Sequence, residues 1–245
     1  MNRTLVAGAA FGIGAAVSMR LSGAGHLVGV VDVDGDAARS LAAEITMLGG
    51  ASVGIEADLT IAGEVERAVE GFADQAGGID GLVNCVGGFM TNAQLEDVTL
   101  DEWERVVRLN LTAPFLLIKE VVVHLRKSPC ARIVNIASVA GRTAVEGASI
   151  PYSAAKAGLI GLTRRAAVEL AADGIALNAI APGLVDSPRV REVHAERLVG
   201  LLETVPTRRL ATTDEIAAAV EYLLSAEAGY LVGAVLDING GRIPV

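Results

Sequence analysis

The sequence lacks an apolar run long enough to cross a membrane. Its 245 residues are 52% apolar, with a mean hydropathy of +0.49, but charged residues cut the apolar stretches short, as Lys119 and Glu120 do after Phe115–Ile118. A transmembrane helix needs about 20 consecutive apolar residues. The first residues also lack the basic stretch and long apolar core of a secretory signal. We therefore expect no membrane partner and a cytoplasmic protein.

Cysteine and clustered positive charge are also scarce. Cys85 and Cys130 match neither a disulfide framework nor the spacing of a metal site, so we expect no metal and two reduced thiols buried in apolar strands. The net charge is −9, and no basic run is longer than a pair such as Arg164-Arg165. This charge would repel a phosphate backbone, which excludes nucleic acid as a partner.

What the sequence does contain is an alternation of short β-branched runs with longer amphipathic stretches. The predicted strands are Thr4–Ala7, Leu27–Val31, Ser52–Ile55, Gly81–Val83, Arg132–Ile136, Ala176–Ile180 and Ala234–Ile238. Strands separated by helices form a parallel sheet that is covered on both faces. We therefore predict the α/β class: a single-domain, doubly wound (Rossmann) fold over residues 1–245, with a seven-stranded, mostly parallel sheet and helices on both faces.

Two finer features of this organisation follow from local patterns. The capping boxes Thr99–Glu102 and Thr212–Glu215 predict where two helices begin. Residues 184–211 are irregular and rich in charge, and we predict that they form a substrate lid over one end of the sheet.

A glycine-rich loop, Gly8-Ala-Ala-Phe-Gly12-Ile-Gly14, follows the first predicted strand. Glycines let a pyrophosphate approach the backbone closely, and the N-terminus of the following helix favours its negative charge. The loop therefore predicts a dinucleotide site. Its expected contacts are Gly8, Phe11, Gly12, Ile13 and Gly14.

Asp32 ends the second predicted strand, where a carboxylate accepts hydrogen bonds from the adenosine ribose and repels the 2′-phosphate of NADP. Phe11 stands in the glycine loop, and no Arg or Lys follows Asp32 before Arg39, so a cation for a 2′-phosphate is missing. We predict NAD as the cofactor, with NADP less favoured. The alternative is that Asp32 only caps the next helix, for which Asp34 and Asp36 are equally suited.

Tyr152 and Lys156 stand four residues apart in a segment typical of a helix start, and residues at this spacing share one helix face. A nearby ammonium favours the phenolate, and so lowers the pKa of a tyrosine from its usual value of about 10. The pair is therefore suited to proton transfer at neutral pH. The alternative is a Tyr152 side chain that packs on its helix beside a solvated Lys156.

The chain resembles the compact form of the short-chain dehydrogenase/reductase family. The resemblance rests on motifs in this chain order: the glycine loop, Asn84, Asn110, Ser138, the Tyr152–Lys156 pair and Pro182-Gly183. The resemblance covers essentially the whole chain. Within that family the final segment, residues 228–241, is most similar to 3-oxoacyl-carrier-protein reductases.

The resemblance implies four catalytic residues. Tyr152 would exchange a proton with the substrate oxygen, and Lys156 would hold the nicotinamide ribose and lower the pKa of the phenol. Ser138 would hydrogen-bond the carbonyl or alkoxide, and Asn110 would bind a water that connects Lys156 to solvent. The alternatives are an ordinary helix-interior amide for Asn110 and a hydroxyl that only satisfies its own turn for Ser138.

The resemblance also implies further cofactor contacts. Asn84–Gly87 matches the family's Asn-Asn-Ala-Gly motif with Cys85 in second place, Asp58 matches an adenine-contacting aspartate, and Ser187 stands for a threonine that contacts the carboxamide. Alternatively, Asp58 starts the next helix and Ser187 is a plain loop hydroxyl. The implied contacts are Asp58, Leu59, Asn84, Gly87, Pro182, Gly183, Val185 and Ser187, together with Tyr152 and Lys156.

The cradle and the proton relay together predict hydride transfer between NAD(H) and a secondary alcohol or ketone, with Tyr152 as general acid and base. One alternative is an NADPH-dependent reductase of 3-oxoacyl thioesters, which the final segment favours and Asp32 disfavours. Another is a dinucleotide sensor that has lost catalysis.

Mostly apolar residues are expected around the reactant, including Gly88–Met90 and Leu184, and they predict a hydrophobic small-molecule substrate. Arg189, Arg191 and His194 are either contacts for a substrate anion or solvated lid residues. Small and apolar residues along 113–123 and 154–170 predict helices that pack against copies of themselves, and the resemblance implies a homotetramer.

Overall fold

The protein, seen in a computed structural model, is a three-layer α/β sandwich. The structure describes residues 2–88, 93–145, 147–187, 190–191 and 198–243. The strands are β1 Arg3–Ala7, β2 Leu27–Asp32, β3 Ala51–Glu56, β4 Gly81–Asn84, β5 Arg132–Ile136, β6 Ala176–Pro182 and β7 Val235–Ile238. The α-helices are α1 Gly12–Gly23, α2 Gly35–Met47, α3 Ala62–Ala76, α4 Leu100–Val107, α5 Ala113–Leu125, α6 Ile150–Leu170, α8 Leu198–Glu203 and α9 Thr213–Leu224.

The sheet has the strand order β3-β2-β1-β4-β5-β6-β7, and every pairing is parallel. The predicted fold class is therefore confirmed, and each predicted strand is present within two residues of its expected ends. The strand order reverses between β1 and β4, which leaves a crevice at the carboxyl ends of these strands. The glycine loop after β1 and the segment Cys85–Gly88 after β4 lie at this crevice.

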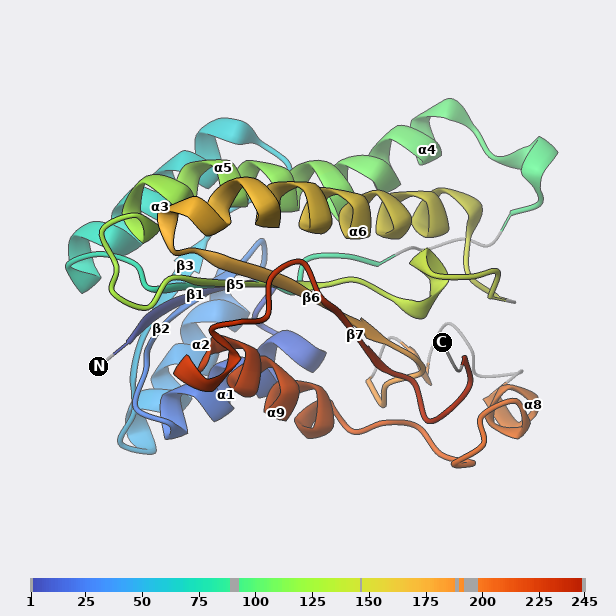
Figure 1. The fold of residues 1–245 in the computed structure, drawn as a ribbon. Coiled ribbons are helices and arrows are strands. Elements are labelled where there is room, and N and C mark those ends of the chain that lie inside the picture. The colour runs from blue at the N-terminus through green and yellow to red at the C-terminus, as the bar shows by residue number, and fades with distance from the viewer. Residues whose placement is uncertain (1, 89–92, 146, 188–189, 192–197, 244–245) are drawn as a thin grey trace.

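Each face of the sheet is buried under helices. Figure 1 shows α3, α5 and α6 over one face and α1, α2 and α9 over the other. Neighbouring strand residues alternate between the two cores: Leu5 packs on the first and Val6 on the second. Strands that are buried on both faces read as continuous apolar runs, which is why the sequence indicated them.

Two helix starts have the capping hydrogen bonds that the sequence predicts. Thr212 and Glu215 form the predicted capping box at α9, and the Thr99 hydroxyl accepts the Glu102 N–H at α4. Residues Arg108–Thr112, between α4 and α5, form one turn of π-helix, η2. Pro114 follows in the first turn of α5, which continues directly from η2, and proline lacks the N–H that a helix interior uses. Turns of this kind inside helices often mark functional sites.

The two cysteines depart from the prediction. Cys85 follows β4 and Cys130 precedes β5, so neither lies in a strand, and both are free and half-buried. Within the part of the chain that the structure describes, no helix is both long and apolar enough to span a bilayer.

Candidate functional site

The glycine loop is built to leave room for a ligand. Gly8 and Gly12 have φ angles of +70° and +55°, a left-handed backbone that favours glycine. A Cβ on Gly14 would lie 2.0 Å from the Gly8 carbonyl oxygen, so the close crossing of the loop and α1 requires glycine there. The loop therefore has the tight backbone path that a phosphate cradle needs.

The N-terminus of α1 is left open. Phe11 is the N-cap residue, its side chain makes no capping hydrogen bond, and the first turn of α1 has no acidic residue. Among the described residues no side chain accepts from the first N–H groups of the helix, and their partial positive charge suits a phosphate. These residues fit the pyrophosphate of a dinucleotide.

Asp32 lies beside this loop at the end of β2. Its Oδ2 accepts a hydrogen bond from the Ala10 N–H at 3.0 Å, and its Oδ1 accepts one from the Asp34 N–H at 3.2 Å. The next helix, α2, is capped instead by Asp34, whose side chain accepts from the Ala37 N–H. The alternative role of Asp32 as a helix cap is therefore wrong.

The first cation after Asp32 is already engaged. Arg39 donates to Asp36 at 2.7 Å and to Glu56 at 3.2 Å. Phe11 is 62% exposed and offers no charge. The surroundings of Asp32 are therefore acidic, which suits ribose hydroxyls better than a phosphate.

The Tyr152–Lys156 pair lies at the start of α6. Ser149 caps this helix by accepting the Tyr152 N–H, and Pro151 occupies its first turn. The Lys156 Nζ lies 5.7 Å from the centre of the Tyr152 ring. The helix start was thus predicted correctly, and the two side chains share one face.

Lys156 is buried, with 3% of its surface exposed, and its Nζ donates a hydrogen bond of 2.8 Å to the Ile136 carbonyl. The alternative of a solvated lysine is therefore wrong. Burial lowers the pKa of Lys156 to about 8, although the nearby Cys85 opposes the shift. At pH 7 the group is therefore still mostly an ammonium.

Ser138 follows β5 and begins the 3-10 turn η3, Val139–Gly141. Its Oγ accepts the Ala140 N–H at 3.1 Å, as the simpler reading of this residue expected. The hydroxyl also lines the cavity beside Tyr152, so it retains a proton to donate. The turn hydrogen bond therefore does not prevent a bond from Ser138 to a substrate oxygen, which stays a prediction.

Asn110 is fully buried in the π-turn η2. Its Nδ2 donates to the carbonyls of Val106 at 2.9 Å and Gly88 at 2.8 Å, and its Oδ1 accepts the Gly88 N–H at 2.8 Å. It is therefore not an ordinary helix-interior amide. A Cβ on Gly87 would lie 2.6 Å from Asn110 Oδ1 and 2.8 Å from Lys156 Nζ, so this glycine lets both groups approach.

These elements enclose a cavity of about 190 Å³ at the carboxyl edge of the sheet. Nine of its lining residues were predicted as site residues: Ile13, Gly87, Ser138, Tyr152, Lys156, Pro182, Gly183, Val185 and Ser187. Gly88 was expected to contact the substrate and also lines it.

Val190 lies in the predicted lid, and three lining residues were missed: Cys85, Ile136 and Ala137. The position of Cys85, Ile136 and Ala137 at the ends of β4 and β5 could have indicated them, because parallel strands end at one edge. Burial raises the pKa of the Cys85 thiol to about 12, against the effect of Lys156, so it is neutral at pH 7.

Besides Asp32 and the loop residues Gly8, Phe11, Gly12 and Gly14, three more predicted cofactor contacts lie outside this cavity lining. Asn84 is fully buried and donates to Asn135 Oδ1 at 2.6 Å, and Leu59 packs in the core under α3 and α5. The Asp58 carboxylate accepts hydrogen bonds from the N–H and hydroxyl of Thr60 in the turn before α3. These bonds do not test a contact of Asp58 with adenine, which stays a prediction.

The predicted lid is described only in part. Arg191 forms an ion pair with Asp186 at 2.6 Å, so its charge is balanced. Phe89, Met90, Arg189 and His194 lie outside the described residues. Among the residues that the structure describes, no group of three or more His, Cys, Asp or Glu side chains could hold a metal ion.

Comparisons with known proteins agree with this geometry. Residues 8–242 match the family model described as "Enoyl-(Acyl carrier protein) reductase". The chain is 35% identical to the 3-oxoacyl-[acyl-carrier-protein] reductase FabG of Salmonella typhimurium over 98% of this chain and 97% of the relative. It is also 35% identical to the cis-4-hydroxycyclohexanecarboxylate dehydrogenase of Sinomonas cyclohexanicum, over 98% and 96% of the two chains.

Solved structures give the same result. A short-chain type dehydrogenase/reductase from Mycobacterium marinum superposes with a TM-score of 0.94 at 28% identity, over 100% of this chain and 96% of the other. A 3-oxoacyl-[acyl-carrier protein] reductase from Brucella melitensis gives a TM-score of 0.94 at 30% identity, over 99% and 92%.

Proposed function

The chain belongs to the short-chain dehydrogenase/reductase family of oxidoreductases, which use a nicotinamide dinucleotide, and we propose that it interconverts a secondary alcohol and a ketone with NAD(H). One observation carries the proposal. A tyrosine paired with a buried lysine and a serine hydroxyl line one cavity, next to a helix N-terminus that is open to a phosphate.

The cofactor would be held along the crevice between β1 and β4. The Gly8–Gly14 loop and the first N–H groups of α1 would bind the pyrophosphate, and Asp32 would accept the adenosine ribose hydroxyls. Pro182, Gly183, Val185 and Ser187 would form the wall at the nicotinamide end. When bound, the dinucleotide supplies or accepts the hydride.

The protein's own residues move the proton. In alcohol oxidation Tyr152 Oη removes the proton of the substrate hydroxyl, and in ketone reduction it returns a proton to the same oxygen. The Lys156 ammonium, held by the Ile136 carbonyl, stabilises the phenolate. Ser138 donates a hydrogen bond to the substrate oxygen as charge develops on it, and Asn110 fixes Gly88 at the cavity wall.

The preference for NAD is also part of the proposal. It is supported by the Asp32 carboxylate beside the glycine loop, by the neutral Phe11, and by the engagement of Arg39 with two carboxylates. The test is turnover of a panel of secondary alcohols with NAD and with NADP, measured side by side at alkaline pH, followed by ketones with NADH. We expect higher kcat/KM with NAD, and equal or better turnover with NADP would contradict the preference.

A second candidate is an NADPH-dependent reductase of 3-oxoacyl thioesters. The name of the Salmonella typhimurium relative favours it, whereas Asp32 opposes it. Two rates decide between the candidates: reduction of an acetoacetyl thioester with NADPH, and reduction of simple ketones with NADH. A faster rate for the thioester would favour this candidate. A silent dinucleotide sensor would bind NADH but reduce no member of a broad ketone panel, and Tyr152→Phe would change nothing measurable. We expect turnover in the wild type and its loss in this variant.

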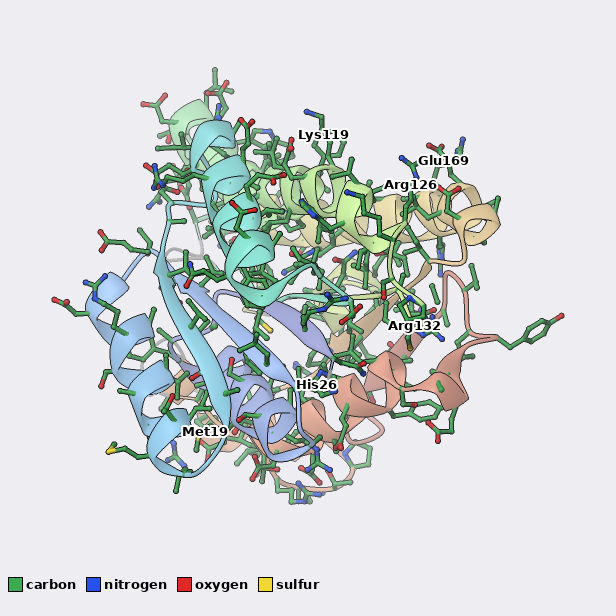
Figure 2. All side chains as sticks on the ribbon, turned by 90° about the vertical axis from the view of Figure 1, so that its left-hand side faces the viewer. Met19, His26, Lys119, Arg126, Arg132 and Glu169 are labelled. Atoms are coloured by element: carbon green, nitrogen blue, oxygen red, sulfur yellow. The ribbon has the colours of Figure 1, made fainter. Side chains whose placement is uncertain are left out.

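We further propose a homotetramer that packs through α5 and α6. Phe115 and Val168 project from these helices with 47% and 72% of their surface exposed, and Figure 2 shows Lys119 and Glu169 on the outer side of the same pair. Light scattering should give a mass about four times the 25.1 kDa of one chain, and Phe115→Glu should lower it. Met47→Glu, on the opposite helix layer, is the matched control, and a wild-type mass near that of one chain would refute the tetramer.

We place the protein in the cytoplasm, where nicotinamide dinucleotides are available to the site and where the two free cysteines would stay reduced. Fractionation of cells that express the tagged protein tests this location.

A further inference from the structure

A largely buried ion pair lies next to the catalytic cavity but does not line it. Arg142 Nη2 is 3.1 Å from Asp237 Oδ2, and the two side chains are 16% and 15% exposed. The other carboxylate oxygen, Oδ1, is buried and has no hydrogen-bond partner among the described residues. Well-packed apolar residues in place of such a pair are often as stable or more stable, so stability alone does not explain it.

Arg142 ends the turn that carries Ser138. The turn is a single hydrogen-bonded unit, in which the Ser138 carbonyl accepts the Gly141 N–H at 3.0 Å and the Val139 carbonyl accepts the Arg142 N–H at 2.9 Å. Gly141 is pressed against α6, because a Cβ there would lie 2.6 Å from the Lys156 carbonyl carbon. A displacement of Arg142 would therefore be passed on to the Ser138 hydroxyl.

Asp237 lies behind another part of the cavity wall, the Pro182-Gly183 segment. It lies on β7, where Asp237 is paired in register with Ala181 and Ile238 with Pro182. The Ile238 carbonyl accepts the Gly183 N–H at 2.8 Å. The strand that carries Asp237 is thus bonded directly to the Pro182-Gly183 segment that lines the cavity.

We propose that the Arg142–Asp237 pair sets the separation of these two walls, and that both are positioning residues that act through Ser138. The inference rests on the proposed function, in which Ser138 binds the substrate oxygen and Pro182-Gly183 borders the nicotinamide end. The pair fixes one wall relative to the other, so that the Ser138 hydroxyl meets the substrate oxygen in the reactive arrangement.

Hydrogen exchange tests the mechanical part without any substrate. In Asp237→Asn we expect the amides of Gly141 and Arg142 to exchange at least tenfold faster, while amides in the middle of α6 stay unchanged. Asp173→Asn, which breaks the exposed ion pair with Arg126, is the matched control and should change neither. Unchanged exchange of the turn in Asp237→Asn would overturn the proposal.

Kinetics test the functional part. A displacement of reacting groups of about 1 Å can cost about 100-fold in rate, so Asp237→Asn should lower kcat about tenfold or more while the Kd for NADH stays within twofold. If the pair acts through Ser138, the same substitution should cost less than twofold in a Ser138→Ala background. An equal loss in both backgrounds would show a merely structural role and overturn the proposal.

Two further variants keep the test decisive. Arg142→Met with Asp237→Val should restore the melting temperature but not kcat, and restoration of both would count against positioning. If Asp237→Asn fails to fold, Arg142→Lys takes its place, since a lysine keeps the charge but loses the planar guanidinium geometry. If Asp237→Asn alters the exchange of the turn but the wild type turns over no alcohol, the proposed function is wrong and the coupling of the two walls still holds.

Discussion

At the scale of single residues, the site contains two charged side chains, Lys156 and Asp32, that are held by backbone hydrogen bonds. Lys156 is a cation with 3% exposure, held by one carbonyl, and its pKa falls to about 8 because burial disfavours the ammonium. The two carboxylate oxygens of Asp32 accept backbone N–H groups of the glycine loop and of the turn before α2. Each residue can be replaced by one of similar size that lacks the charge.

Asp32→Asn should relax the preference for NAD. The amide keeps one oxygen, which can accept the Ala10 N–H, and loses the bond from the Asp34 N–H. The loop should therefore stay in place while the repulsion of a 2′-phosphate is removed. Charges a few ångströms apart near a protein surface interact by about 1–4 kcal/mol, so we expect kcat/KM for NADP relative to NAD to rise about tenfold or more. Asp74→Asn, in the last turn of α3, changes the net charge by the same amount and is the control. A similar rise in that variant would show that the Asp32 carboxylate does not set the preference.

Lys156→Met should lower the activity and raise the stability of the protein. Turnover should fall at least about 100-fold, because the phenol loses the cation that acidifies it. The folded pKa of Lys156 is lowered, so the unfolded chain binds more protons between about pH 8 and pH 10.5, and the wild type gains stability as the pH rises through this window. The variant should therefore melt several degrees higher at pH 7, with a difference that shrinks by pH 10.

Cys85 complicates this comparison, because its pKa is raised to about 12 and it contributes in the opposite sense between about pH 9 and pH 12. The melting temperatures should therefore be compared in a Cys85→Ala background. A Lys156→Met variant that melts lower than its parent at pH 7 would show that the ammonium is stabilising where it lies.

At the scale of elements, helix ends place the reactive groups. Tyr152 lies in the first turn of α6, which is capped by Ser149, and Asn110 lies in a π-turn that interrupts the helix between α4 and α5. The caps at Thr99 and Thr212 could be predicted from sequence because a capping box is a local pattern. The π-turn could not, because Pro114 alone does not specify which carbonyls lose their partners.

The same distinction separates the other successes and failures. The strands, the glycine loop and the Tyr152–Lys156 pair are encoded by neighbours in the chain and could be predicted. The exposure of Cys85 to the cavity depends on which way the segment after β4 turns, and the pairing of Arg142 with Asp237 depends on the whole sheet. A single sequence does not contain that information.

Two helix caps provide a matched pair of tests. Ser149→Ala and Thr212→Ala each remove a hydroxyl that accepts an N–H at a helix start, and each should cost about 1 kcal/mol, or a fall of roughly 2–4 °C in melting temperature. Only Ser149→Ala should also lower kcat, because Tyr152 lies in the turn that it caps. Equal effects on kcat would show that the start of α6 does not position Tyr152.

At the scale of the whole molecule, the two edges of the sheet have different tasks. The carboxyl edge holds the cavity. The opposite edge, where the strands begin, faces the viewer in Figure 2, with His26 and Arg132 upon it, and there hydrogen bonds to a carboxylate join the strand starts. Asp80 accepts hydrogen bonds from Arg3 at 2.7 Å and from Ser128 at 2.7 Å, which join the starts of β1, β4 and β5. Stability and reactivity are therefore located apart.

This tie predicts the response to acid. Burial alone would raise the pKa of Asp80, but the hydrogen bonds from Arg3 and Ser128 outweigh it and lower the pKa to about 2. The unfolded chain then binds the proton first, so the stability from this group is complete above about pH 4 and is lost as the pH falls toward 2. Asp80→Asn should be less stable than wild type at pH 7, by about 3 kcal/mol, and should lose less between pH 5 and pH 3.

Thermal melts at pH 7, 5 and 3 measure this effect. Asp173→Asn, at the exposed pair with Arg126, should follow the wild-type curve throughout. A parallel loss in wild type and Asp80→Asn would assign the acid sensitivity to other carboxylates.

The crossing at Gly14 and the contact of Gly141 with Lys156 have a consequence for how this enzyme tolerates genetic change. A library that samples every amino acid at every codon should show its deepest depletion at such places, where there is no side chain to lose. Alanine, usually the mildest replacement, should be rejected there as firmly as tryptophan.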